Sequence, residues 1–545
     1  MSDELSKRNE GLLQGSYDCV DRVLLNGYYG LCHSAGGFRL WWSRLRGGDE
    51  PLDRNLLMRM AGHFSRRLRA YAAAHGIPIV NCPAGQDKHK LAEEYLEKAS
   101  LRAGVFLILV GRAQAPVWDV SPHGHLEWKH PMPFVNHYSF HILDPDWGHV
   151  TIKLSGHPPF PAQIMLNGHE YVACQARKAG VEFHKEENCF TSIVDVAGLA
   201  QIADTLSESL AIGRLRQVCE RWIYSSCLCF ALRLEEQERS GFQYQYSIYQ
   251  IEYSRNLLFR EGRMMEEMFQ ALIDRSRGPL DVRKIKIILG QKRGPARRAR
   301  RKKRAAWEVA VERPVYDLTV FKVRCGLFTL KIYTKGERVL RVETIAHNVK
   351  KLRCGYSLEK FAEIVQHLQG MLERFMEVLS CMDQCFVGAT TLEELPVATQ
   401  VGKTRVGGVD VNRPRMRWVV HAVLALASCS RGFTASQLAY QVRSLSRDTE
   451  SKYGSRHAAY DLKKLRGKQM VRRIEKTRRY EVLREGLRAM TALLVLRDKV
   501  LRPLLAAAQP LEPSGGAQNP TPIDHHYEVI RIGMQGVFHE LGITA

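Results

Sequence analysis

Four side chains that could act on a phosphodiester lie close together in the segment LKIYTKGERVLRVE, residues 330–343. They are Lys331, Tyr333, Arg341 and Glu343. A carboxylate such as Glu343 can hold a divalent metal ion, which stabilises the charge on phosphoryl oxygens during strand cleavage. These four residues are the candidate catalytic set.

A β-hairpin must position these residues. Alternating apolar and polar side chains predict two strands joined by a three-residue loop, Thr334–Gly336, with Gly336 in the left-handed conformation. In that register Tyr333 pairs with Glu337, and Leu330 pairs with Leu340. One face then carries Phe328, Leu330, Ile332, Leu340 and Val342, and the other carries Lys331, Tyr333, Glu337, Arg341 and Glu343.

A metal site at Glu343 needs further acidic ligands from elsewhere in the chain. Glu252, on a tyrosine-rich strand, and Asp317 are the candidates, with Mg²⁺ or Mn²⁺ as the cofactor. A second set of metal ligands ranks behind this one. It lies in a histidine-rich region, where the turn at 144–148 folds one strand back on the next, and comprises His141, Asp144, Asp146 and His149.

The charge of the chain indicates a polyanionic partner. Lys and Arg number 80 against 57 Asp and Glu, which gives a net charge of +23. Nucleic acid rewards such an excess because bound cations release counterions from phosphates. One segment without large apolar residues, KRGPARRARRKKR, is predicted to be a phosphate-binding arm. Its candidate contacts are Arg297, Arg298, Arg300, Arg301, Lys302, Lys303 and Arg304.

Membrane and secretory classes are not expected. No run of 18 uncharged apolar residues is present, and the N-terminus, MSDELSKRNEG, lacks the cationic-then-apolar order of a signal peptide. We therefore expect a cytoplasmic protein. The 13 cysteines contain no CxxC pair, so free thiols are predicted rather than zinc sites or disulfides.

The C-terminal third has the outline of a winged helix. Helices at 416–428 and 435–443 precede a third helix that begins at Ser455, and two strands with a basic turn follow. The third helix would enter the major groove of DNA, with Arg456 and His457 near base edges. Predicted phosphate or groove contacts are Lys463, Lys464, Lys468, Arg478 and Arg479.

Two resemblances add to this interpretation. The segments LNGHEYVACQARKAGVEFHKEENCFTSI, YQIEYSRNLLF and LKIYTKGERVLRVETIAHN resemble a widespread family of uncharacterised bacterial proteins, over about residues 140–350. The segment LKIYTKGERVLRVE alone is similar to the KxYxKG…RxE hairpin of rolling-circle replication initiators of plasmids and filamentous phages. That resemblance implies that an acidic residue, Glu343 here, helps to hold the metal. The His-apolar-His triplet of nicking enzymes is absent.

The predicted fold is multidomain α+β, with a central antiparallel β-rich module flanked by helices. The expected function is DNA binding and processing for a mobile element, as a replication initiator or transposase-like nuclease. The alternative is a non-catalytic DNA- or RNA-binding protein, including an RNA-complexed effector, in which Glu343 pairs with Arg341. Catalysis and a homodimer are both left open. The predicted parts are an N-terminal domain (1–125), the central module (126–386), a linker (387–413), the winged helix (414–486) and a helical extension (487–545).

Overall fold

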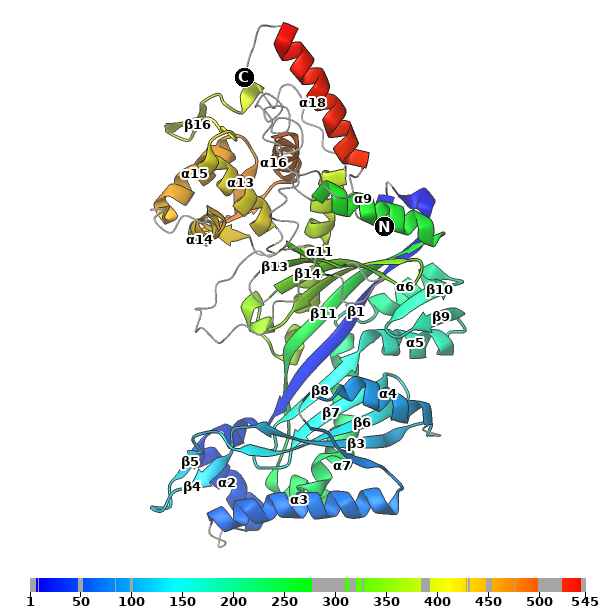
Figure 1. Cartoon of the computed structure of the whole chain (residues 1–545). Coiled ribbons are helices and arrows are strands. Elements are labelled where there is room, and N and C mark those ends of the chain that lie inside the picture. Colours follow the sequence, from blue (N-terminus) through cyan, green and yellow to red (C-terminus); the bar gives the residue numbers. More distant parts are fainter. Residues whose placement is uncertain are drawn as a thin grey trace.

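Two long antiparallel strands, β1 (Leu13–Tyr28) and β11 (Gln245–Phe259), cross the centre of an eleven-stranded sheet (Figure 1). In this computed structural model all neighbouring strands are antiparallel except β2 and β3. Beyond β1 the sheet continues through β8 (Ala162–Asn167), β7 (Gly148–Ser155), β6 (Phe134–Asp144), β3 (Gly104–Gln114) and β2 (Ile79–Asn81). Beyond β11 it continues through β15 (Val339–Ala346), β14 (Phe328–Lys335), β13 (Val320–Cys325) and β12 (Val309–Glu312).

The structure describes most of the chain. The described residues are 6–7, 9–47, 52–83, 85–98, 101–276, 309–312, 320–325, 328–383, 393–427, 429, 432–446, 453–475, 477–497 and 522–540. The predicted basic arm at 292–304 and the predicted metal ligand Asp317 lie outside these residues.

The two halves of the sheet have the same plan. β1 is followed by helices and then by a meander, β3-β6-β7-β8, whose last strand returns to pair with β1. β11 is followed by helix α9 (Gly262–Ser276) and then by β12-β13-β14-β15, whose last strand returns to pair with β11. β1, β2 and β3 belong to the same sheet as the later strands, so this sheet extends across the boundary predicted at residue 125. The α+β class is confirmed.

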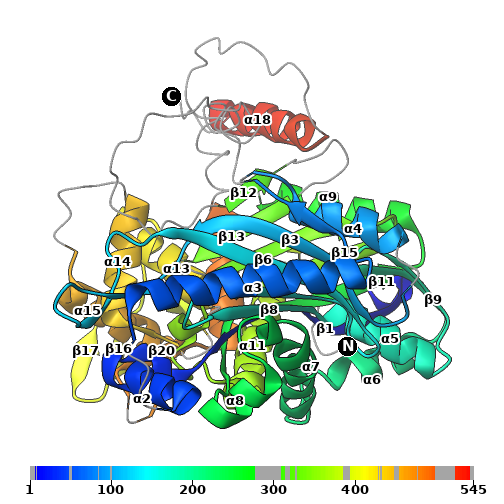
Figure 2. The ribbon, with the colours of Figure 1, turned by 90° about the horizontal axis from the view of Figure 1, so that it is seen from below.

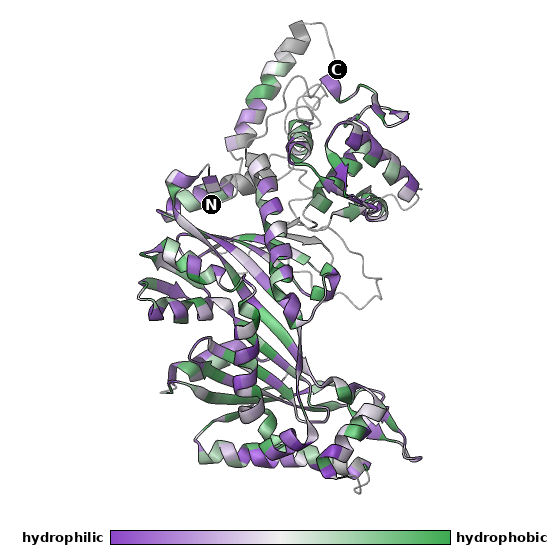
Figure 3. Ribbon diagram, turned by 180° about the vertical axis from the view of Figure 1, so that it is seen from behind, coloured by the Kyte–Doolittle hydropathy of each residue, from purple (hydrophilic) through white to green (hydrophobic). Residues whose placement is uncertain are grey.

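One face of the sheet is apolar. Phe140 of β6 stacks on Phe230, and Tyr138 stacks on Phe64, so aromatic rings join the strands to the helices beneath them. Figure 3 shows both hydrophobic and hydrophilic residues on the strands of the sheet. The core of this face is built with α2 (Ala35–Arg46), α3 (Arg54–Ala74), α7 (Ala211–Ser226) and α11 (Phe361–Asp383), and α8 (Leu234–Ser240) packs on α2.

The opposite face is largely polar and is covered in part. Ala92 of α4 (Lys88–Lys98) packs on Leu107 and Leu109 of β3. Two further helices, α5 (Gly168–Lys178) and α6 (Val196–Asp204), pack on β1 beside the small hairpin β9 (Phe183–Glu186) and β10 (Cys189–Ile193). Figure 2 shows α4 on one side of the strands and α7, α8 and α11 on the other.

A separate core holds the C-terminal module, which Figure 1 shows beside α11. Its predicted three helices and strands are present. They are α13 (Pro414–Ala427), β18 (Phe433–Thr434), α14 (Ala435–Ser446), α15 (Ser455–Gly467), β19 (Val471–Arg473) and β20 (Arg479–Val482). The strands form a sheet in the order β18-β20-β19. Buried Asp461 of α15 connects this helix to α13, since it accepts hydrogen bonds from Arg415 of α13 and from Tyr453.

The segments around this module are more ordered than the sequence predicted. The predicted linker contains a hairpin, β16 (Thr399–Val401) with β17 (Thr404–Val406), and Glu394 accepts a hydrogen bond from Lys468. Helix α16 (Arg484–Leu496) packs on α11, and Arg484 forms an ion pair with Glu377 at 2.6 Å. A last helix, α18, spans Pro522–Glu540. The ten cysteine side chains that the structure describes are free thiols.

Gly168 provides a test of how α5 sits on the sheet. A Cβ at this position would lie 1.7 Å from the carbonyl oxygen of Val20, which belongs to the central strand β1. We expect Gly168→Ala to lower the free energy of unfolding by about 3 kcal/mol or more, measured by chemical denaturation. Gly213→Ala is the matched control: a Cβ there meets nothing within 4 Å, so this variant should gain about 0.5–1 kcal/mol. Equal stability of the two variants would contradict this packing.

Candidate functional site on the polar face of the sheet

The hairpin of β14 and β15 carries the predicted residues on one face, but in a different register. Tyr333 pairs with Arg341, and Lys331 pairs with Glu343, so the predicted pairing of Tyr333 with Glu337 was wrong. The three-residue loop is Gly336–Arg338 instead of Thr334–Gly336, and Gly336 has the predicted positive φ, 61°. The face assignment is correct for the strand residues, because moving the loop by two residues preserves the alternation of the strands, whereas Glu337 lies in the loop.

Glu252 and Glu343 form a carboxylate pair on the polar face. Ser254 of β11 lies opposite Glu343, which makes Glu252 a diagonal neighbour of Glu343 on the adjacent strand. Burial, followed by the charge of Glu343, raises the pKa of Glu252 to about 7. The structure therefore brings together two of the three predicted acidic ligands, in an arrangement that disfavours two negative charges.

Lys331 and Tyr333 complete the surroundings of Glu343. The Lys331 ammonium lies 3.1 Å from Glu343 Oε2, and the Tyr333 hydroxyl donates to the same oxygen at 3.5 Å. Burial and the nearby Glu343 charge raise the pKa of Tyr333, so its phenol keeps its proton at neutral pH. The predicted pairing of Glu343 with Arg341 is replaced by pairing with Lys331.

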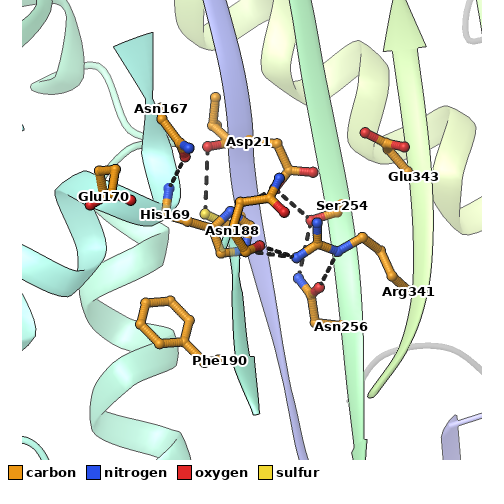
Figure 4. A network of polar contacts seen from close by, with 12 residues as sticks. Asp21, Asn167, His169, Glu170, Asn188, Phe190, Ser254, Asn256, Arg341 and Glu343 are labelled. Atoms are coloured by element: carbon orange, nitrogen blue, oxygen red, sulfur yellow. Dashed lines mark hydrogen bonds and ion pairs between the residues drawn. The ribbon is translucent and has the colours of Figure 1, made fainter. Parts of the chain in front are cut away.

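Arg341 belongs to a buried polar ring that lies next to the carboxylate pair (Figure 4). Its Nε donates to Asn256 Oδ1 at 2.7 Å, and its Nη2 donates to His169 Nε2 at 3.2 Å and to the carbonyl of Asn188. Asn256 donates to Ser254 Oγ, and Ser254 donates to Asp21 Oδ1 at 2.8 Å. His169 Nδ1 lies 2.9 Å from the same Asp21 oxygen and closes the ring.

Local structure explains how the ring forms. Asn167 caps α5 by accepting a hydrogen bond from the His169 backbone, which places His169 over β1. The other members come from β1, β11 and β15, so four elements meet at one point. All five side chains, Asp21, His169, Ser254, Asn256 and Arg341, are at most 2% exposed.

Opposite charges offset the burial of the ring. Burial alone would raise the pKa of Asp21, but Arg341 and His169 overcome this effect, and the pKa lies below its usual value. Burial, together with Arg341, lowers the pKa of His169 despite the opposing effect of Asp21, so the imidazole is neutral at pH 7. Because Arg341 donates to Nε2, the His169 proton sits on Nδ1 and faces Asp21.

The ring also determines whether a metal fits there. Donor atoms of Cys19, Asp21 and His169 lie within 4.8 Å of one another, a spacing that a transition metal could bridge. However, both His169 nitrogens already face ring members, and the Arg341 guanidinium would oppose a cation. A second group with the same spacing, Cys354, Glu363 and His367, lies near the start of α11, where Lys360 pairs with Glu363.

The second predicted metal set is only partly assembled. His141 Nδ1 and His149 Nε2 approach to 3.0 Å, as the predicted fold-back of the strands requires. The two acids turn away from them, because Arg221 of α7 forms ion pairs with both Asp144 and Asp146. Burial lowers the pKa of His141 to about 3 and of His149 to about 4, so both imidazoles are neutral.

The predicted nucleic-acid contacts of the C-terminal module are of two kinds. Arg456, His457 and Arg478 are exposed, while Lys463 and Lys464 are half-buried. Lys464 covers the ring of Tyr460, which is 47% exposed. Three predicted contacts make internal hydrogen bonds: His457 Nδ1 accepts one from the Gly454 backbone, Lys468 donates to the carbonyl of Glu394, and Arg479 donates to the carbonyl of Gly432.

Sequence reasoning missed most of the ring. Asp21, His169, Ser254 and Asn256 were not candidates, and more than 300 residues separate Asp21 from Arg341. One signal was available, since Asp21 interrupts the apolar segment CVDRVLL and a strand that is buried on both sides rarely keeps an unpaired acid.

Comparisons of the chain with protein-family models, with curated proteins and with solved structures find no match. Among the described residues, no helix combines the length and apolar character needed to cross a membrane.

Removing one charge of the ring should be more harmful than removing both. Arg341→Gln leaves Asp21 ionised and buried without its partner, and we expect a loss of about 3–5 kcal/mol in the free energy of unfolding. Adding Asp21→Asn should recover part of that loss, because the amide needs no counter-charge. Chemical denaturation of the two single variants and the double variant measures this coupling. Strictly additive losses would contradict an electrostatic coupling between the two side chains.

Proposed function

We propose that this protein binds DNA and cleaves a strand with the help of a divalent metal ion, as a replication initiator or a transposase-like nuclease of a mobile element. The carboxylate pair carries the proposal. Two acids, one with a pKa of about 7, are diagonal neighbours on adjacent strands, beside a lysine and a tyrosine. Glu343 is 5% exposed, and the other three side chains are half-buried. A cation between the carboxylates would relieve their repulsion.

Mg²⁺ or Mn²⁺ fits the donor set better than a softer metal. Both prefer carboxylate oxygens, and Mg²⁺ is commonly held by one or two carboxylates together with water and substrate phosphate. Glu252 and Glu343 would hold the ion, which would stabilise charge on the phosphoryl oxygens. Lys331, now 3.1 Å from Glu343, would then be released toward a substrate phosphate.

Arg341 acts in this proposal as a positioning residue. It is fully buried, and its Nε and Nη2 donate to ring members and to a backbone carbonyl. Because Arg341 and Glu343 are two residues apart on β15, the ring fixes the strand that presents Glu343. Tyr333, protonated and hydrogen-bonded to Glu343, can donate a hydrogen bond at the same place.

The C-terminal module would act as a winged helix that selects the DNA site. Its α15 buries Ala458, Leu462 and Leu465 against the module core, so the opposite face points outward. That outward face carries Arg456, Tyr460 and Lys463, which are suited to base edges and phosphates in a major groove. Arg478 at the turn between β19 and β20 extends the basic surface.

The second candidate is a non-catalytic binder of DNA or structured RNA, including an RNA-complexed effector. One observation favours it: Lys331 already neutralises Glu343 without any metal. The basic surfaces would then bind nucleic acid, and the carboxylate pair would be a structural feature of the sheet.

Substitution of the carboxylates tests cleavage. With supercoiled or single-stranded DNA and Mg²⁺ or Mn²⁺, we expect Glu343→Gln and Glu252→Gln each to reduce cleavage at least 100-fold. Cleavage by the wild type should rise as the pH increases through about 7, because the metal needs Glu252 deprotonated, and then level off.

Glu337→Gln is the matched control, since Glu337 is exposed in the turn of the same hairpin. It should cleave at the wild-type rate, and EDTA should stop all cleavage. Cleavage that survives Glu343→Gln would refute the site. Absence of cleavage by the wild type on every substrate would leave the binding protein as the better account.

Arg456→Ala tests the role of the C-terminal module. We expect a loss of about 1–3 kcal/mol in binding of a preferred duplex and weaker discrimination between sequences, measured by fluorescence anisotropy. Arg239→Ala removes the same charge from an exposed position on α8 and should change affinity less than twofold. Equal effects of the two substitutions would show that general charge, and not α15, governs binding.

A further inference from the structure

Four basic side chains converge at the other end of the polar face. The Nζ of Lys88, at the start of α4, would lie 3.8 Å from a Cβ at Gly111, and Gly111 pairs with His137 of β6. His137 pairs with Ser155 of β7, and Lys153, two residues before Ser155 on β7, lies on the same face of the sheet as His137. Ser155 Oγ accepts a hydrogen bond from the backbone of His157, which follows β7. We call Lys88, His137, Lys153 and His157 the basic pocket.

The basic pocket has positive charge without an acidic counter-charge. Burial, Lys153, Lys88 and His157 lower the pKa of His137 to about 4. Burial and Lys88 also lower the pKa of Lys153, and among the described residues no carboxylate is a cause of either shift. Charges of one sign that are not neutralised locally favour a ligand of the opposite sign.

Two ring nitrogens in the pocket are buried and have no hydrogen-bond partner among the described residues. They are His137 Nε2 and His157 Nδ1. A buried polar atom without a partner costs free energy, so such atoms are usually satisfied by water or by a ligand. A cation is excluded as the ligand by two ammonium groups. A phosphate group suits the site because its oxygens accept several hydrogen bonds at once.

The basic pocket and the carboxylate pair lie on the same face of the sheet. Lys153 pairs with Gln163, Gln163 pairs with Asn26, and Asn26 pairs with Ser247. Ser254 lies seven residues further along β11, and the register shift at Leu24/Leu25, which adds Tyr249 to β11, keeps Ser247 and Ser254 on the same face. Glu343, on β15, lies opposite Ser254. The pocket is therefore about 19 Å from Glu343 across the strands and about 23 Å along them. The two distances together give a diagonal that about nine nucleotide steps of a helical strand would span.

Polar side chains connect the two sites. Gln163 donates a hydrogen bond to Asn26, both are half-buried, and Gln250 of β11 donates to Glu252. A nucleic-acid strand crossing this face would thus meet amide groups between the pocket and the carboxylates.

We infer that the basic pocket binds a backbone phosphate of the nucleic-acid strand whose more distant part reaches the carboxylate pair. The inference rests on the proposed function, from which we take it that the ligand is a nucleic-acid strand. Lys88 and Lys153 supply the charge, and the two imidazoles supply directed hydrogen bonds. The pocket thereby sets which phosphodiester reaches Glu252 and Glu343.

Binding measurements on the full chain test this inference. The probes are inorganic phosphate, followed by calorimetry, and a 20-nucleotide single strand, followed by anisotropy. We expect the double variant Lys88→Ala/Lys153→Ala to bind each of the two probes at least tenfold more weakly than the wild type. The slope of log affinity against log salt concentration for the single strand should fall by about 0.7 for each phosphate that the variant no longer neutralises.

Lys90→Ala is the matched control, because Lys90 is an exposed lysine of the same helix, and it should change either affinity less than twofold. Wild-type affinity of the double variant for the single strand would overturn the inference, even if phosphate binding were abolished. An equally large effect of Lys90→Ala would overturn it as well. Circular dichroism checks that each variant is folded.

The outcome is separable from that of the cleavage experiments. Glu343→Gln should keep wild-type affinity for inorganic phosphate. A wild type that never cleaves DNA, combined with weaker strand binding by the Lys88→Ala/Lys153→Ala variant, would refute the proposed cleavage and support the pocket.

Discussion

The buried pairing of Arg341 with Asp21, through His169, Ser254 and Asn256, is the interaction on which the centre of this structure depends. Two charges are tolerated inside the sheet because they attract each other and because both groups make hydrogen bonds to neighbouring side chains. The ring joins β1, β11 and β15 to α5. It fixes the two halves of the sheet where β1 pairs with β11.

The position of the ring has a consequence for the neighbouring carboxylates. Glu343 follows Arg341 by two residues, and Glu252 precedes Ser254 by two residues, so both point to the face that the ring occupies. Rigid neighbours hold the acids together, although separation would lower their repulsion. Strained electrostatics of this kind commonly mark sites that bind a cation or carry out proton transfer.

The polar face as a whole carries a gradient of charge. The carboxylate pair lies at the β11–β15 end, amides occupy the middle, and the basic pocket lies at the β6–β7 end. The C-terminal module is attached to α11 on the apolar side through α16 and the Arg484–Glu377 ion pair. Site selection and action on the strand would therefore be carried out by different surfaces of one protein.

Local patterns determined a substantial part of this protein. The alternation in 328–346 was enough to place Lys331, Tyr333, Arg341 and Glu343 on one face, even though the loop was misplaced by two residues. Helical periodicity and glycine positions were enough to predict the elements of the C-terminal module. Both signals act over a few residues, and a shift of two positions leaves the faces of a strand unchanged.

Tertiary structure alone decided what those residues meet. Nothing near Arg341 in the sequence indicates that Asp21 and His169 neutralise and orient it, because strand order and helix packing bring those groups together. The same holds for Asp144 and Asp146, which pair with Arg221 instead of the nearby histidines. Pairing across a sheet depends on the whole topology, whereas the face of a side chain depends on its immediate neighbours.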